Sequence, residues 1–225
     1  MVSNFQERFL TEPECYILLK ENGFSVPPFA VCQSEEEACL KAEEIGFPVV
    51  LKIVSPHVIH KSDAGGVMVG LTEKGSLRKA YYQVHENVRS RIPNAQIQGV
   101  LIQPFFQGGL EVIVGGLLDA QFGPAVMFGL GGIFVELLKD VTFRVAPFSE
   151  EEATKMLKEV KGYPLLMGYR GREPLDILSL ASLLSKVSCF MVENPQVIEL
   201  DLNPVFLFPR GFAISDARIK IRSEL

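Results

Sequence analysis

Three segments of the chain carry both the start and the stop signals of a helix, and they restrict the fold more than any other feature. Each begins with Ser or Thr followed three residues later by Glu, the capping-box pattern. Each also runs to a glycine, so the predicted helices extend from Thr11 to Gly23, from Ser34 to Gly46 and from Ser149 to Gly162. Further helical patterns cover about Ser76–Arg91 and Pro174–Val192. Helices are therefore spread along the whole chain.

Strand-like runs bounded by glycine or proline lie between these helices. They are Pro48–Val54, Gly66–Leu71, Gly99–Phe105, Leu110–Leu117, Pro124–Gly129, Thr142–Phe148, Val197–Phe208 and Phe212–Ile221. The two kinds of element mix without the strict alternation of a doubly wound parallel fold. The pattern predicts an α+β class with largely antiparallel sheets. A seam near Pro93–Gly99 predicts two subdomains, residues 1–98 and 99–225.

The composition excludes several classes of protein. The 225 residues include 22 Lys and Arg against 27 Asp and Glu, a net charge of −5, and 48% are hydrophobic, which suits a chain with a buried core. A pI near 5.4 argues against nucleic acid or an anionic membrane as the main partner. No apolar run approaches the roughly 18–20 residues of a membrane span, and Met1–Leu10 lacks the pattern of a signal peptide. We expect a cytoplasmic protein that binds neither nucleic acid nor a membrane.

The sequence does not contain a complete copy of either of two common phosphate-binding motifs. The P-loop pattern G-x-x-x-x-G-K-[ST] is absent. The stretch from Gly129 to Phe134 begins like a dinucleotide fingerprint but has phenylalanine in place of the third glycine. Read alone, this stretch is more typical of a tight turn.

The segment from Lys52 to Val67 is more informative. Lys52 interrupts an apolar strand, so its ammonium either has an anionic partner or reaches solvent from an edge strand. His60 and Lys61 precede Gly65-Gly66, and paired glycines let backbone N–H groups approach a phosphate closely. Lys61 adds a positive charge there. The alternative for His60 is an ordinary histidine of a turn.

Polar side chains alternate along the strand-like run near the end of the chain. Glu199, Asp201 and Asn203 share one face, and Asp216 follows on the next run after a turn. A hairpin would bring Asn203, Asp201 and Asp216 together, and such oxygen ligands suit Mg²⁺ that bridges nucleotide phosphates. An ordinary solvated strand face is the alternative. Glu111 and a second carboxylate, at position 136, have apolar neighbours, which predicts that both are paired or functional.

Taken in order, these elements resemble the ATP-grasp nucleotide-binding β subunit of ADP-forming acyl-CoA synthetases, which is related to the β subunit of succinyl-CoA synthetase. The resemblance extends from Thr11 to about Ile221. Five blocks carry it: GFPVVLKIVSPHVIHKSDAGGV (46–67), GVLIQPFFQGGLEVIVG (99–115), QFGPAVMFGLGGIFVELLKDVTFRVAPF (121–148), KGYPLLMGYRGREP (161–174) and IELDLNPVF (198–206).

The resemblance implies an ATP-grasp fold whose two subdomains clasp Mg-ATP or Mg-ADP, and it assigns roles to individual residues. In residues 1–98, Lys52 and Lys61 would bind the nucleotide phosphates, and His60 would carry a phosphoryl group. In residues 99–225, Gln103 would lie along the adenine and Glu111 would bind the ribose. Asn203 and Asp216 match the Mg²⁺ ligands, with Asp201 a weaker candidate ligand.

The activity that this resemblance implies is the reversible conversion of acyl-CoA, ADP and phosphate to acid, CoA and ATP through a phosphohistidine relay. It further implies an α subunit with the CoA-binding and ligase domains, for which 225 residues leave no room, and a heterotetramer. Two alternatives stay open. One is an ATP-grasp ligase that acts through an acyl-phosphate and needs no phosphorylated His60. The other is a non-catalytic nucleotide-sensing module.

Overall fold

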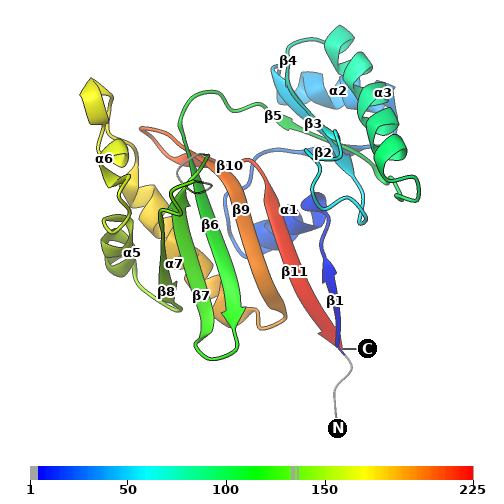
Figure 1. Cartoon of the computed structure of the whole chain (residues 1–225). Helices are drawn as coiled ribbons and strands as arrows, with labels where there is room; N and C mark the ends of the chain where they lie inside the picture. Colours follow the sequence, from blue (N-terminus) through cyan, green and yellow to red (C-terminus); the bar gives the residue numbers. More distant parts are fainter. Residues whose placement is uncertain (1–4, 133–134, 136, 225) are drawn as a thin grey trace. The chain divides into compact units, whose positions relative to one another are not determined.

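The computed structural model describes residues 5–132, 135 and 137–224, and the chain divides into two compact units. The smaller unit consists of Phe9–Glu21 and Val26–Phe106, and the larger unit of Met1–Arg8, Asn22–Ser25 and Gln107–Leu225. Each unit has its own sheet with helices against it (Figure 1). The predicted α+β class with largely antiparallel sheets is confirmed.

The smaller unit is built on a four-stranded antiparallel sheet with two helices that supply its core. The strand order is β2 (Ala30–Cys32), β5 (Gly99–Pro104), β3 (Val49–Val54), β4 (Val67–Leu71). Helices α2 (Glu35–Ile45) and α3 (Lys74–Arg91) pack on the sheet through buried apolar side chains, while α1 (Glu12–Glu21) precedes β2. Because β5 hydrogen-bonds to both β2 and β3, it lies in this unit. The division in the structure therefore follows Phe106, whereas the predicted seam precedes Gly99.

The larger unit contains a seven-stranded sheet. Its order is β1 (Phe5–Phe9), β11 (Ala217–Glu224), β9 (Val197–Leu207), β6 (Leu110–Asp119), β7 (Gly123–Leu130), β8 (Val141–Val145), with β10 (Phe212–Ile214) also paired to β9. Helix α7 (Ile177–Glu193) packs across β6, β7 and β9. Gly116 makes this packing possible, since a Cβ there would lie 2.7 Å from Sδ of Met191. Short helical segments α6 (Tyr163–Leu166) and η1 (Tyr169–Gly171) precede α7.

The three predicted helix starts are confirmed at the level of single hydrogen bonds. The Ser34 hydroxyl accepts the N–H of Glu37 at 3.1 Å, and the Ser149 hydroxyl accepts the N–H of Glu152 at 3.3 Å. At the first helix, the Glu14 carboxylate accepts the N–H of Thr11 at 2.7 Å.

Helix α5 (Glu150–Leu157) ends before the predicted stop at Gly162. The carboxylate of Asp140 accepts the backbone N–H groups of Lys161 and Gly162 at 2.8 and 2.9 Å. These two bonds hold residues 161–162 in a turn, so the helix cannot continue to the glycine.

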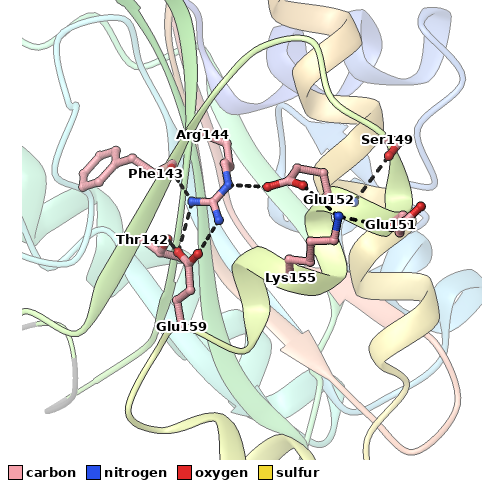
Figure 2. A network of polar contacts seen from close by, with 8 residues as sticks. All are labelled: Thr142, Phe143, Arg144, Ser149, Glu151, Glu152, Lys155 and Glu159. Carbon is pink, nitrogen blue, oxygen red and sulfur yellow. Dashed lines mark hydrogen bonds and ion pairs between the residues drawn. The ribbon is translucent and has the colours of Figure 1, made fainter.

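A polar network joins α5 to β8 (Figure 2). The guanidinium of Arg144 donates to Glu152 at 2.9 Å and to both carboxylate oxygens of Glu159, and the Thr142 hydroxyl donates to Glu159 at 2.6 Å. Hydrogen bonding to Arg144 lowers the pKa of both Glu152 and Glu159. The network therefore anchors the helix to the last strand of the sheet.

Among the described residues we find no helix whose length and apolar character would let it span a bilayer.

Candidate functional site

Lys52 lies on β3, which has β5 on one side and β4 on the other, so it is not on a sheet edge. Its side chain is buried, and its Nζ lies 2.6 Å from Oε1 of Glu12 at the start of α1. An ammonium group held by an anionic partner is the interpretation that the structure supports. The alternative, a lysine that reaches solvent from an edge strand, is wrong.

The carboxylate of Glu12 joins residues from four segments of the smaller unit. Its second oxygen, Oε2, lies 3.2 Å from Nζ of Lys61, and the Tyr16 hydroxyl donates to Oε1 at 2.9 Å. The same hydroxyl lies 3.1 Å from Oε1 of Gln103, whose side chain is fully buried. We call Glu12, Tyr16, Lys52, Lys61 and Gln103 the Glu12 cluster. It brings together three of the four residues predicted to bind the nucleotide.

The segment that follows β3 folds into a compact turn rather than an open phosphate cradle. The N–H groups of Ala64, Gly65 and Gly66 donate to the carbonyls of His60, Ser62 and Lys61 at 3.1, 2.9 and 2.7 Å. The expectation that N–H groups at the paired glycines are available to a phosphate is therefore not met. Asn87 on α3 also donates to the carbonyl of Gly65 at 2.9 Å, which holds the turn against the helix.

The three histidines of the chain differ in what their rings contact. Nδ1 of His57 accepts the N–H of Gln96 at 3.1 Å, and Nδ1 of His85 lies 2.7 Å from the carbonyl of Tyr81. His60 is exposed, and within the described part of the chain its imidazole has no hydrogen-bond partner. Its ring nitrogens are thus accessible for chemistry.

In the larger unit, the predicted hairpin brings Asn203 and Asp216 together. The N–H of Asn203 donates to the carbonyl of Asp216 at 3.2 Å. Asp201 is half-buried and accepts a hydrogen bond from Arg218 at 3.1 Å. Burial raises the pKa of the Asp201 carboxyl; Arg218 lowers this pKa, while the carboxylates of Asp216 and Glu199 raise it further.

A shallow cavity of about 470 Å³ opens on this face of the larger sheet. Its lining includes the polar residues Asp201, Asn203 and Arg218 beside the apolar Met127 and Phe143. No group of three or more His, Cys, Asp and Glu side chains in the described ranges could hold a metal ion by itself. A metal here would need other ligands, such as water and phosphate oxygens.

Of the two glutamates predicted to be paired or functional, the structure describes only Glu111. Glu111 is the second residue of β6 and is exposed, so the argument from its apolar sequence neighbours does not apply. The exposure leaves its carboxylate accessible to a ligand. The carboxylate at position 136 lies outside the described residues.

Comparison with known proteins places this chain in a family. The model of the ATP-grasp domain matches residues 2–221. The chain is also 49% identical over 214 residues to the β subunit of ADP-forming acetate–CoA ligase I from Pyrococcus furiosus, which covers 95% of this chain and 92% of that protein. This chain belongs to the ATP-grasp family of ADP-forming acetate–CoA ligase β subunits.

Solved structures agree with this membership of the acetate–CoA ligase β-subunit family. An acetyl-coenzyme A synthetase of Ca. Korarchaeum cryptofilum, solved with coenzyme A and Ca-AMPCP, matches with a TM-score of 0.93 and 52% identity, over 96% of this chain and 94% of that chain. Another structure of the same protein contains Mg-AMPPCP and a phosphohistidine segment that points towards its nucleotide-binding site. The predicted ATP-grasp fold and the predicted family are confirmed.

The family also contains longer chains. The ADP-forming acetate–CoA ligase I of Archaeoglobus fulgidus is 48% identical over 208 residues, which is 92% of this chain but 30% of that protein. The segment equivalent to this chain is thus one part of a larger polypeptide in that relative.

Within this β-subunit chain, sequence reasoning missed Glu12 and Tyr16. Glu12 stands inside the Thr11–Glu14 capping box, where a first-turn glutamate is expected for the helix alone. Lys52 itself indicates that an acidic partner exists, because a lysine buried inside a strand needs an acidic group beside it. Nothing in the spacing identifies which acidic residue this is.

Proposed function

We propose that this chain is the nucleotide-binding, phosphoryl-transferring β subunit of an ADP-forming acyl-CoA synthetase. The enzyme would convert acyl-CoA, ADP and phosphate to acid, CoA and ATP, reversibly. The similarity to the Pyrococcus furiosus β subunit over 95% of this chain supports the proposal. So does the Korarchaeum relative, which was solved with coenzyme A, a magnesium nucleotide analogue and a phosphohistidine segment.

The observation that carries the proposal is the state of His60. Its imidazole is exposed and unengaged among the described residues, whereas His57 and His85 each use Nδ1 in a contact with the backbone. A neutral imidazole is a good nucleophile near neutral pH. The next residue, Lys61, belongs to the Glu12 cluster, so the histidine lies beside buried positive charge suited to phosphate.

In the transfer step, the protein mainly positions the reacting groups and offsets the negative charge of the phosphates. In the direction that consumes ATP, a ring nitrogen of His60 attacks the γ-phosphorus, the bond to the β–γ bridging oxygen breaks, and ADP leaves. The other ring nitrogen then releases its proton to water. The resulting phosphoramidate can phosphorylate ADP in the reverse direction, and the lysines offset the anionic oxygens throughout.

The remaining site residues receive roles that fit their surroundings. Lys52 and Lys61 would bind nucleotide phosphates, Gln103 would lie along the adenine, and Glu111, whose carboxylate is exposed, would bind the ribose.

Asn203 and Asp216 supply oxygen ligands of the type that Mg²⁺ prefers, and they would hold the ion together with water and phosphate oxygens. When bound, Mg²⁺ would neutralise charge on the phosphates. Asp201 is the weaker candidate, because Arg218 already occupies one of its oxygens.

A partner chain is part of the proposal. The β-subunit name of the Pyrococcus relative and the longer Archaeoglobus chain support an α subunit. We further propose that this partner carries the CoA-binding and ligase domains and that the assembly is a cytoplasmic heterotetramer. Exposed apolar side chains at Leu137, Leu138, Met167 and Tyr169 offer surface for such a contact.

Phosphate labelling tests the proposal. The chain is incubated with Mg-[γ-³²P]ATP, and we expect an acid-labile, alkali-stable label, as a phosphohistidine gives. His60→Ala should abolish the label, and His57→Ala, the control, should keep it. No label on the wild type, or a label that survives in His60→Ala, would overturn the relay and favour the acyl-phosphate ligase or the nucleotide-sensing module.

A further inference from the structure

The Glu12 carboxylate binds two ammonium groups that come from different segments. Lys52 on β3 lies 2.6 Å from one oxygen, and Lys61 in the turn after β3 lies 3.2 Å from the other. The Glu12 side chain is 3% exposed, and the two lysine side chains are 6% and 13% exposed. The three charged groups therefore interact where water screens them little.

One carboxylate thus holds two ammonium groups in a largely buried place. Without the carboxylate, the two ammonium groups would repel each other, and at least one would be displaced towards solvent. Glu12 thus holds Lys52 and Lys61 close together.

Glu12 also connects to the residue predicted to lie along the adenine. The Tyr16 hydroxyl lies 2.9 Å from Glu12 and 3.1 Å from the Gln103 side chain. Since Tyr16 and Glu12 both lie on α1, one turn of this helix contacts β3, β5 and the turn that contains His60.

We propose that Glu12 is a positioning residue of this enzyme: it holds Lys52 and Lys61 as one phosphate-binding pair and fixes the turn that carries His60 to β3. This inference rests on the proposed function, in which the two lysines bind nucleotide phosphates. Glu12 itself need not touch the nucleotide, because it acts through the two lysines.

A double-mutant cycle on the whole chain tests this role. Mg-ADP affinity is measured by calorimetry for the wild type, Glu12→Gln, Lys52→Met and the double variant. We expect Glu12→Gln to weaken binding about tenfold, as for a lost charge-assisted contact. In the Lys52→Met background the same change should weaken binding only about threefold, because Lys61 is then the one lysine left for Glu12 to hold. A merely structural role would weaken binding equally in both backgrounds, and that result would overturn the inference.

A matched control exists on the surface of the same unit. Glu43 lies 2.7 Å from Lys74 in an exposed ion pair, so Glu43→Gln makes the same chemical change without touching the Glu12 cluster. It should leave affinity unchanged. Hydrogen exchange gives a second readout: Glu12→Gln should speed exchange at the amides of residues 64–66 about tenfold, and Glu43→Gln should not. Unchanged exchange there in Glu12→Gln would contradict the link to the turn.

If Glu12→Gln shows no cooperative unfolding, Lys61→Gln carries the test, with Lys74→Gln as its control. Lys61→Gln keeps the Lys52–Glu12 pair, and it should speed exchange at residues 64–66 while the melting temperature stays near that of the wild type. Equal exchange in the two lysine variants would overturn the inference. The proposed function fails by a different result, namely absence of Mg-ADP binding to the wild type or full affinity in Lys52→Met.

Discussion

Replacing Lys52 by methionine would remove the ammonium from the Glu12 cluster while keeping most of the buried side-chain volume. Breaking a buried ion pair from one side costs about 3–5 kcal/mol. Part of this cost is offset, since Glu12 keeps Lys61 at 3.2 Å and Tyr16 at 2.9 Å, and a hydrogen bond to a charged group contributes about 1.5–3 kcal/mol. We therefore expect the free energy of unfolding to fall by about 2–3 kcal/mol.

Urea denaturation followed by circular dichroism measures this loss, with unfolding midpoints compared at equal slope. The double variant Lys52→Met/Glu12→Gln should be destabilised by less than the sum of the two single changes, because both remove the same contact between Lys52 and Glu12. A loss below about 0.5 kcal/mol in Lys52→Met, the range of ordinary surface substitutions, would refute the reasoning that the ammonium is buried against Glu12.

Three further predictions concern the larger unit. Arg144→Met should lower the free energy of unfolding by about 1 kcal/mol, less at about 1 M salt. Because Arg144 lowers the pKa of Glu159, the wild type should be more stable than Arg144→Met near neutral pH, and this difference should disappear as the pH falls and Glu159 is protonated. A difference in the free energy of unfolding that persists in urea denaturation at about pH 2 would contradict this. Gly162→Ala would place a Cβ 2.0 Å from Cδ1 of the buried Leu130, so the free energy of unfolding should fall by about 1–3 kcal/mol. An unchanged urea midpoint would contradict this close packing. Asp216→Asn should weaken Mg-ADP binding about tenfold but leave metal-free ADP binding unchanged; equal calorimetric losses with and without Mg²⁺ would rule out a role as metal ligand.

The sequence predicts the secondary structure correctly where residues close together in the chain determine it. Ser34 and Ser149 each cap a helix as predicted, because a cap and its acceptor lie within one turn. The alternation of polar and apolar residues also predicts strand β9. Strands β1 and β2 were not predicted, since β2 has three residues and β1 (FQERF) pairs with β11 from the opposite end of the chain.

The site could be predicted only in part. The sequence predicts Lys52, Lys61 and Gln103 as nucleotide-binding residues, and the structure brings them into one cluster. The carboxylate that joins them was not foreseen, because Glu12 lies 40 positions from Lys52 and its place in a capping box already explains a glutamate there. The same limit applies to the paired glycines at 65 and 66. Their sequence is typical of a phosphate cradle, yet their N–H groups close the turn onto its own carbonyls.

Transfer of phosphate from the isolated phosphorylated chain to ADP tests the central claim most directly. The chain is labelled with Mg-[γ-³²P]ATP, freed of nucleotide by gel filtration and mixed with unlabelled Mg-ADP. If His60 carries phosphate as an intermediate, the label should leave the protein and appear in ATP. Label that remains on the protein, or is released only as inorganic phosphate, would contradict the account.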